Sequence, residues 1–93
     1  MAESPLEKRC VKYAKSEGWI VRKVVYAGRK GAPDRWHLKK GRWVLIELKD
    51  LDKEPTEIQE REHYRLRAAG AFVYVVDTFD QYKAILDSHA RSL

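Results

Sequence analysis

The sequence has a single cysteine, three prolines and no long hydrophobic run. The lone Cys10 excludes a disulfide within the chain, and without paired Cys/His spacings a structural zinc site is not expected. No apolar stretch approaches the roughly 20 residues that a membrane-spanning helix requires. The N-terminus is polar, shows no signal-peptide pattern and leads directly into a predicted helix. We therefore expect a cytoplasmic protein in a reducing setting, with Cys10 packed in the core.

Positive charge is in excess. Lys and Arg number 19 against 14 Asp and Glu, giving a net charge of +5, and the pI is near 9.4. Such a balance favours a polyanionic partner such as a nucleic acid. With 93 residues, of which 44% are apolar, the chain can form one small core, so we expect one domain over residues 1–93.

Capping and turn signals give the order of the elements. The segment Ser4-Pro5-Leu6-Glu7 is a capping box that predicts a helix to about Glu17, ended by Gly18. Thr56 with Gln59, and Thr78 with Gln81, open two further helices. The buried stripe of the first helix comprises Leu6, Cys10, Tyr13 and Ala14. The remaining predicted segments are a strand at 19–26, a basic loop at 27–32, a hairpin around 35–48, a loop at 51–55, a strand at 71–76 and a last helix reaching about His89.

The spacing of Asp34 and Glu47 carries the chemistry. If Lys40-Gly41 is the two-residue hairpin loop, Asp34 faces Glu47 across the two strands, with Cβ atoms roughly 5 Å apart. Like charges so placed repel unless a cation lies between them, and Mg²⁺ or Mn²⁺ suits carboxylate oxygens. Lys49 lies on the same strand face as Glu47. An isolated Glu-x-Lys is usually only a solvated strand end, but a Gly-x-Pro-Asp segment opposite it favours a metal-dependent phosphodiesterase site.

These motifs in this order resemble the PD-(D/E)xK nuclease superfamily. More narrowly they resemble the VRR-NUC (virus-type replication-repair nuclease) domain in its stand-alone, phage or prophage form. The matching residues are Glu7, Gly31-x-Pro33-Asp34, Glu47-x-Lys49 and Gln59. The resemblance extends from Glu7 to about Asp77. It implies a restriction-endonuclease-like α/β fold, with an α-β-β-β-α-β-α core in which helices flank a central mixed sheet.

The resemblance also implies roles for the residues of the site. Asp34 and Glu47, with the backbone carbonyl of Leu48, would hold Mg²⁺ or Mn²⁺, and Lys49 would orient or help deprotonate the attacking water. Glu7 would be an active-site residue as well as the acid of the capping box, as a ligand to a second metal or to a water on the metal. Gln59 would close its own capping box and also orient a water, the phosphate or Lys49.

The sequence pattern also indicates roles for polar residues outside the carboxylate pair. Arg29 and Lys30 in the glycine-containing loop would contact DNA phosphates near the site. The basic cluster at the hairpin tip would contact phosphates as well, and consists of Lys39, Lys40 and Arg42. We expect structural roles for His37 and His63. Glu62 lies within the apolar stripe of its helix, where it would pair with an arginine or meet a second subunit.

The resemblance implies a structure-selective DNA endonuclease with a role in DNA repair. Our leading hypothesis is a homodimer that resolves four-way (Holliday) junctions, because symmetric cutting needs two active sites. One alternative is a flap-trimming or restriction-like DNA nuclease with the same site. The other is a non-catalytic DNA-binding module.

Overall fold

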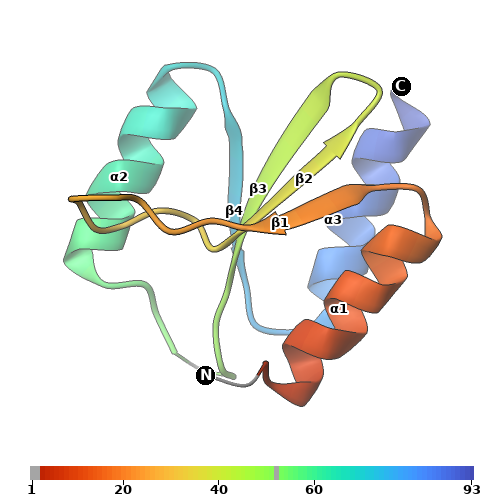
Figure 1. Cartoon of the computed structure of the whole chain (residues 1–93), viewed down its shortest axis with the longest axis horizontal. Coiled ribbons are helices and arrows are strands. Elements are labelled where there is room, and N and C mark those ends of the chain that lie inside the picture. Colours follow the sequence, from red (N-terminus) through yellow and green to blue (C-terminus); the bar gives the residue numbers. More distant parts are fainter. Residues whose placement is uncertain (1–2, 52) are drawn as a thin grey trace.

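The computed structural model describes residues 3–51 and 53–93 and contains a four-stranded sheet flanked by helices (Figure 1). The elements are α1 (Pro5–Ser16), β1 (Ile20–Lys23), β2 (Arg35–Lys39), β3 (Arg42–Leu48), α2 (Glu57–Ala68), β4 (Phe72–Val76) and α3 (Phe79–Arg91). The strand order is β1-β2-β3-β4, with β4 parallel to β3 and the other neighbours antiparallel. The predicted mixed-sheet core is confirmed. Position 52, in the loop predicted at 51–55, lies outside the described residues.

The central hairpin has the predicted register. Trp36 pairs with Leu45, and the turn consists of Lys40 and Gly41, whose φ angles are 48° and 80°. Positive φ at both central positions is typical of the type I′ turn, whose twist matches that of the flanking strands, and glycine adopts such a φ without strain. The last pair in the ladder joins Arg35 to Ile46. One step further, the same register places Asp34 opposite Glu47.

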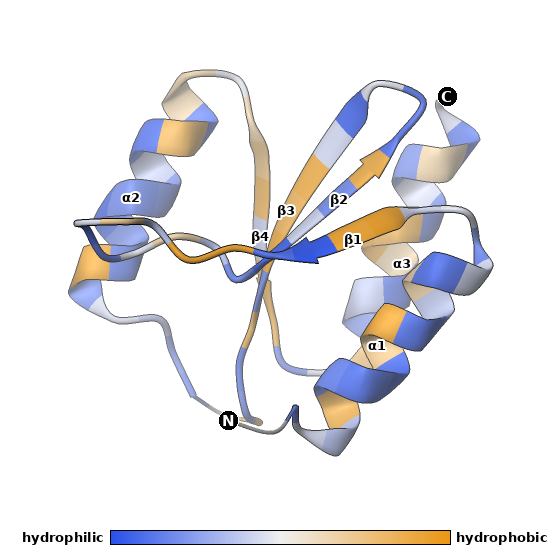
Figure 2. Ribbon diagram, in the orientation of Figure 1, coloured by the Kyte–Doolittle hydropathy of each residue, from blue (hydrophilic) through white to orange (hydrophobic). Residues whose placement is uncertain are grey.

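One face of the sheet packs against α1 and α3, which lie side by side (Figure 1). Cys10 is fully buried in this core, as predicted. Figure 2 shows that both helices carry hydrophobic bands among polar ones, as amphipathic helices do. The helix and sheet residues that meet here are Cys10 and Ala14 of α1, Val44, Ile46 and Leu48 of β3, and Tyr82 and Leu86 of α3.

The α2 helix lies on the opposite side of the sheet, next to β4 (Figure 1). Side chains alternate along a strand, so Leu45 and Glu47 face away from the α1–α3 core formed by Val44, Ile46 and Leu48. Leu45 pairs with Val73 of β4, and both are buried outside the α1–α3 core. The carboxylate of Glu47 therefore lies on the side of the sheet that α2 covers. Among the described residues, no helix combines the length and hydrophobicity needed to cross a membrane.

Three details differ from the sequence prediction. The strand predicted to reach position 26 ends at Lys23, and Val25 beyond it is 82% exposed. The last helix extends to Arg91. The capping box predicted for α1 is only partly formed, because the backbone N–H of Glu7 donates to Ser4 Oγ (3.1 Å) whereas the Glu7 carboxylate pairs with Arg35 (3.2 Å). The buried guanidinium of Arg35 offers this carboxylate a stronger partner than a backbone amide.

Candidate active site

The hairpin brings Asp34 and Glu47 to the same end of the sheet. Asp34 directly precedes β2, and Glu47 is the penultimate residue of β3. The backbone N–H of Leu48 donates to Asp34 Oδ1 (3.2 Å), and the backbone N–H of Val24 donates to the Asp34 carbonyl (3.0 Å). Burial raises the pKa of the Asp34 carboxyl, and the bond from Leu48 opposes this shift. The backbone of the hairpin therefore holds the first carboxylate beside the strand that carries the second.

Glu47 is a buried acid with an unsatisfied oxygen. The residue is 5% exposed, its Oε2 accepts from Gln59 Nε2 (3.3 Å), and the same oxygen lies 3.7 Å from Lys49 Nζ. Its Oε1 has no hydrogen-bond partner among the described residues. Burial, followed by the charge of Asp34, raises the pKa of Glu47 to about 7. A buried carboxylate oxygen without a donor is costly, so this oxygen is suited to a cation.

Gln59 connects α2 to the carboxylates. The side-chain Oε1 of Gln59 accepts from the backbone N–H of Thr56 (2.9 Å), and the backbone N–H of Gln59 donates to Thr56 Oγ1 (3.2 Å). These two bonds complete the predicted capping box. The side-chain Nε2 of Gln59 meanwhile donates to Glu47. The two ends of one amide thus serve two purposes, the helix cap and the orientation of a candidate metal ligand.

Glu7 lies at the margin of the site. Its carboxylate accepts from Arg35 Nη2, which is also paired with Glu3. The negative charge of Glu7 contributes to the raised pKa of Asp34, so the two acids interact. Over residues 3–51 and 53–93, however, no three acidic, histidine or cysteine side chains converge as a metal-binding group. Coordination of a metal by Glu7 remains a prediction, and the contact that the structure shows is the ion pair with Arg35.

The carboxylate pair opens into a cavity of about 280 Å³. Asp34, Glu47 and Gln59 line it together with residues 24–26 and 29–32, which include Arg29 and Lys30. The two loop cations predicted to contact phosphate are therefore beside the carboxylates. Lys49 is close to the carboxylates as well, because its Nζ lies 3.7 Å from Glu47 Oε2.

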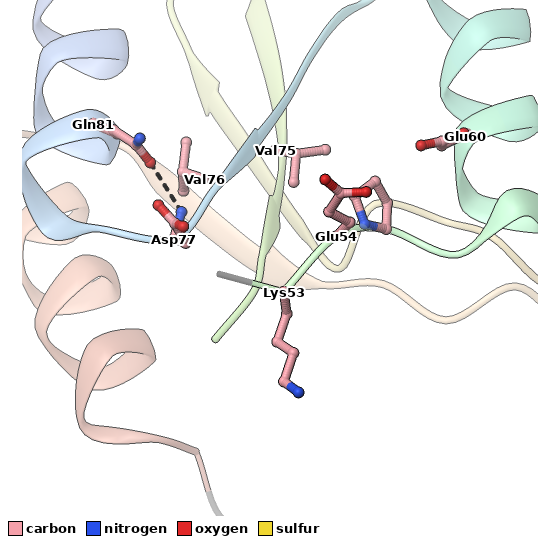
Figure 3. Close-up of a pocket in the computed structure, with 8 residues that line it drawn as sticks. Lys53, Glu54, Glu60, Val75, Val76, Asp77 and Gln81 are labelled. Carbon is pink, nitrogen blue, oxygen red and sulfur yellow. Dashed lines mark hydrogen bonds between the residues drawn. The ribbon is translucent and has the colours of Figure 1, made fainter. Parts of the chain in front are cut away.

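A neighbouring pocket of about 380 Å³ has a different character (Figure 3). It lies between α2, the end of β4 and the start of α3, where the Asp77 backbone N–H donates to Gln81 Oε1 (2.9 Å). Its lining contains three acids, Glu54, Glu60 and Asp77, and one cation, Lys53. This acidic side repels a phosphate backbone, so a polyanion is favoured on the side of Arg29 and Lys30.

The basic cluster at the hairpin tip does not line the cavity that contains Asp34 and Glu47. Lys40 is six residues from Asp34, which along a strand corresponds to roughly 20 Å. Lys39 Nζ donates to the Glu17 carbonyl (2.6 Å), and Arg42 Nη1 lies 2.9 Å from His89 Nδ1. Phosphate contacts by Lys39, Lys40 and Arg42 remain a prediction, and they would involve DNA well away from the scissile bond.

Two histidines have the buried positions expected of structural residues. His37 lies 2.9 Å from the Val44 carbonyl and 2.6 Å from the Tyr82 hydroxyl, and burial lowers its pKa to about 4. His63 is also buried, and burial again lowers the pKa of its imidazole. Both rings are therefore neutral at physiological pH.

Sequence reasoning missed Arg35 and Tyr26. Arg35 follows Asp34 directly, is 6% exposed and pairs with Glu7 and Glu3. Strand alternation was the available signal, because it turns Arg35 to the face opposite Asp34, where a buried guanidinium requires acidic partners. Tyr26 was assigned to a strand, but it lines the cavity and donates to Glu62 Oε2 (2.6 Å). No local pattern in the sequence indicates this contact.

The comparisons with known proteins agree with this architecture. No family model matches the chain. A protein of Acyrthosiphon pisum secondary endosymbiont phage 1, named "Putative nuclease p44", is 40% identical over 79 residues, which are 84% of this chain and 85% of the relative. A solved structure described as a VRR_NUC domain superposes with a TM-score of 0.76 at 40% identity, over 90% of this chain and 97% of the other. Fold and similarity together define a nuclease domain of the PD-(D/E)xK class. Within that class, the chain belongs to the VRR-NUC family.

Proposed function

We propose that this chain is a divalent-metal-dependent DNA endonuclease whose site is built on Asp34 and Glu47. The observation that best supports the proposal is the buried Oε1 of Glu47, which lacks a hydrogen-bond partner in the part of the chain that the structure describes and lies next to a second carboxylate. A metal cation would supply the missing partner, and its charge would favour the ionised form of both acids. Arg29 and Lys30 in the same cavity, with a net charge of +5, support a nucleic-acid substrate.

The residues present fit Mg²⁺ or Mn²⁺. Asp34 and Glu47 would hold the ion through hard oxygen ligands, with the carbonyl of Leu48 as a further ligand, and Glu7 would serve a second ion or a water on the metal. When bound, the cation supplies positive charge to the phosphate oxygens and lowers the pKa of a water. The side chains of this chain would position the water, the phosphate and the metal ligands.

Lys49 is the proposed partner of the attacking water. Its Nζ is 3.7 Å from Glu47 Oε2, and its side chain is 18% exposed, so it can contact both the acid and a substrate. It would orient the water, help to deprotonate it, and stabilise the charge that develops on the phosphate. Gln59 would keep Glu47 in place. In-line attack on phosphorus breaks the bond to the 3′ oxygen and leaves a 5′-phosphate and a 3′-hydroxyl.

We further propose branched DNA as the substrate and a homodimer as the active form. The described residues contain one Asp34–Glu47 pair, whereas symmetric cutting of a four-way junction requires two sites related by a two-fold axis. Within this proposal the enzyme acts in DNA repair in the cytoplasm, which is that of a bacterial host if the gene belongs to a phage.

The test is cleavage of a labelled four-way junction, with linear duplex, flap and single-stranded DNA as controls. Wild type is compared with Glu47→Gln, which keeps the shape of the site, and with Glu57→Gln, which removes an exposed charge on α2. Each protein is assayed with Mg²⁺, Mn²⁺ and EDTA, and its mass in solution is measured by light scattering. We expect paired metal-dependent nicks from a dimeric wild type and from Glu57→Gln, and none from Glu47→Gln.

Other outcomes would revise the proposal in defined ways. Cutting of flaps or linear duplex alone, still lost in Glu47→Gln, would keep the nuclease and discard the junction. Metal-independent binding without cutting of any substrate would discard the nuclease and leave a DNA-binding module.

A further inference from the structure

Glu62 is a nearly buried acid on α2 that has no place in the site described so far. Its side chain is 8% exposed. Its Oε1 accepts from Arg29 Nη2 (3.2 Å) and Arg65 Nε (3.2 Å) and forms an ion pair with Arg65 Nη2 (3.1 Å). Its Oε2 accepts from the Tyr26 hydroxyl (2.6 Å). These bonds, with that from Tyr26 the largest influence, hold the pKa of Glu62 below its usual value. One carboxylate therefore gathers two arginines and a tyrosine.

Two of the three partners belong to the loop that forms the cavity wall. Tyr26 and Arg29 line the same cavity as Asp34 and Glu47. Gly31, in the same loop, approaches α2 so closely that a Cβ there would lie 3.0 Å from both the Glu62 Cβ and the Ile58 carbonyl oxygen. The loop is thus fastened to α2 at three points, all within one turn of Glu62. Gln59, which orients Glu47, lies on the preceding turn of the same helix.

Arg29 and Arg65 both contact Glu62, yet each leaves much of its side chain exposed to solvent. The side chain of Arg29 is 57% exposed and that of Arg65 is 54% exposed, although both contact the buried Glu62. A guanidinium has N–H donors on more than one edge, and its fork matches phosphate geometry. With one edge of each held by Glu62, the remaining donors are oriented in advance and open to solvent. Together Glu62, Arg29 and Arg65 keep a net positive charge beside the cavity wall that Arg29 forms.

We infer that Glu62 is a positioning residue for DNA cleavage: it fastens the loop of Arg29 to α2 and presents Arg29 and Arg65 as a paired contact for a backbone phosphate next to the scissile one. This inference rests on the proposed function. It assigns Arg65 to the substrate-binding surface together with Arg29. It also gives Glu62 a role that depends on its charge rather than on its volume.

A change at Glu62 should affect DNA cleavage without weakening DNA binding. Replacing Glu62 by glutamine adds one unit of positive charge to the protein, so the electrostatic attraction for DNA is not weakened. The arginines and the loop lose their fixed geometry, however, and a displacement of about 1 Å near a reacting phosphate costs up to about 100-fold in rate. A residue that only stabilised the fold would change neither the rate at saturating DNA nor the local stability of this loop alone.

The experiment compares wild type, Glu62→Gln and Glu57→Gln. Glu57 forms an exposed pair with Arg61 on the same helix and is 81% exposed, so its replacement changes the net charge identically without touching the loop. DNA affinity is measured by fluorescence anisotropy in EDTA, and the single-turnover cleavage rate is measured at saturating DNA with Mg²⁺. Loop anchoring is measured separately as the rate of trypsin cleavage after Arg29 and Lys30, with the fragments identified by mass.

For Glu62→Gln we expect affinity equal to or tighter than wild type, a cleavage rate lower by about tenfold or more, and trypsin cleavage of the loop faster by about fivefold. Glu57→Gln should match wild type in all three. Wild-type cleavage rates at saturation in Glu62→Gln would overturn the inference, and so would unchanged trypsin cleavage. If Glu62→Gln fails to fold, Tyr26→Phe, which removes only one hydroxyl, must show the same pattern to a smaller degree. A wild type that cuts no DNA would overturn the proposed function, and the trypsin rates alone would then decide whether Glu62 anchors the loop.

Discussion

Replacing Glu47 by glutamine should destroy the proposed activity and at the same time stabilise the metal-free fold at alkaline pH. Burial and the neighbouring Asp34 raise the pKa of Glu47 to about 7 from a usual 4.5. The folded state therefore favours the protonated, neutral form of this acid. Glutamine has the same shape and is neutral at every pH, and its amide oxygen can still accept from Gln59.

The size and sign of the effect follow from proton linkage. Between pH 4.5 and 7 the folded protein retains a proton on Glu47 that the unfolded chain has released, so the free energy of unfolding falls as the pH rises through this window. The full difference between the two pKa values corresponds to about 3 kcal/mol. Above pH 7 the wild type carries this cost in full, and the Glu47→Gln variant is free of it. Below pH 4.5 the two proteins should have similar stabilities.

Urea unfolding in EDTA at pH 5 and pH 8, followed by tryptophan fluorescence, measures this difference, because Trp19 is 3% exposed and reports on the core. The stability advantage of Glu47→Gln over wild type should be larger at pH 8 than at pH 5 by about 2 kcal/mol. Glu57→Gln is the control and should show no such dependence. Saturating Mg²⁺ at pH 8 should stabilise wild type and not Glu47→Gln. An advantage that is independent of pH, or a wild type that is the more stable protein at pH 8, would refute the reasoning.

Three further predictions follow from contacts in the structure. Gln59→Glu keeps an acceptor for the Thr56 N–H but replaces the donor to Glu47 by a second carboxylate, so it should lower both the cleavage rate and the stability to urea in EDTA. Thr56→Ala removes only the helix cap, so it should cost about 1 kcal/mol of stability without abolishing cleavage. Gly31→Ala places a Cβ at φ 102° and 3.0 Å from α2, so it should cost about 1–3 kcal/mol in thermal unfolding and also slow cleavage. Tyr82→Phe removes the hydroxyl that lies 2.6 Å from His37 Nε2 in the core, so it should cost about 1–2 kcal/mol in urea unfolding without lowering the cleavage rate at saturating DNA.

The parts of the structure that the sequence predicted are those set by local rules. The two-residue turn at Lys40 and Gly41 fixes the register of its hairpin, and this register alone determines which residues face each other. The helix boundaries at Thr56 and Thr78 follow from capping boxes that the structure contains in full. Periodicity likewise predicts that Cys10 is buried.

The parts that the sequence did not predict depend on contacts between distant segments. Residues 24–26 are Val, Val and Tyr, which favour a strand, but the ladder of β1 with β2 ends at Lys23. The chain leaves the sheet there, and Tyr26 reaches Glu62, 36 residues away. Arg29 makes its contact across 33 residues. No periodic pattern or short motif encodes such pairs. The sequence therefore predicted an arginine partner for Glu62, which the structure confirms, but not that one of its partners is Arg29 of the distant loop.

Folding and the proposed catalysis place opposite demands on Glu47 but the same demand on its neighbour Gln59, and mutation can distinguish the two cases. The folded state is destabilised by the charge of Glu47, which a metal site requires. Gln59 satisfies both demands, because its oxygen caps α2 while its nitrogen holds Glu47. Gln59→Ala should therefore lower both the stability and the cleavage activity. Glu47→Gln should instead raise the stability of the metal-free protein and abolish cleavage. In a small domain with a limited core, sharing of this kind lets a costly pair of buried acids persist, since the contacts that orient the site also stabilise the fold.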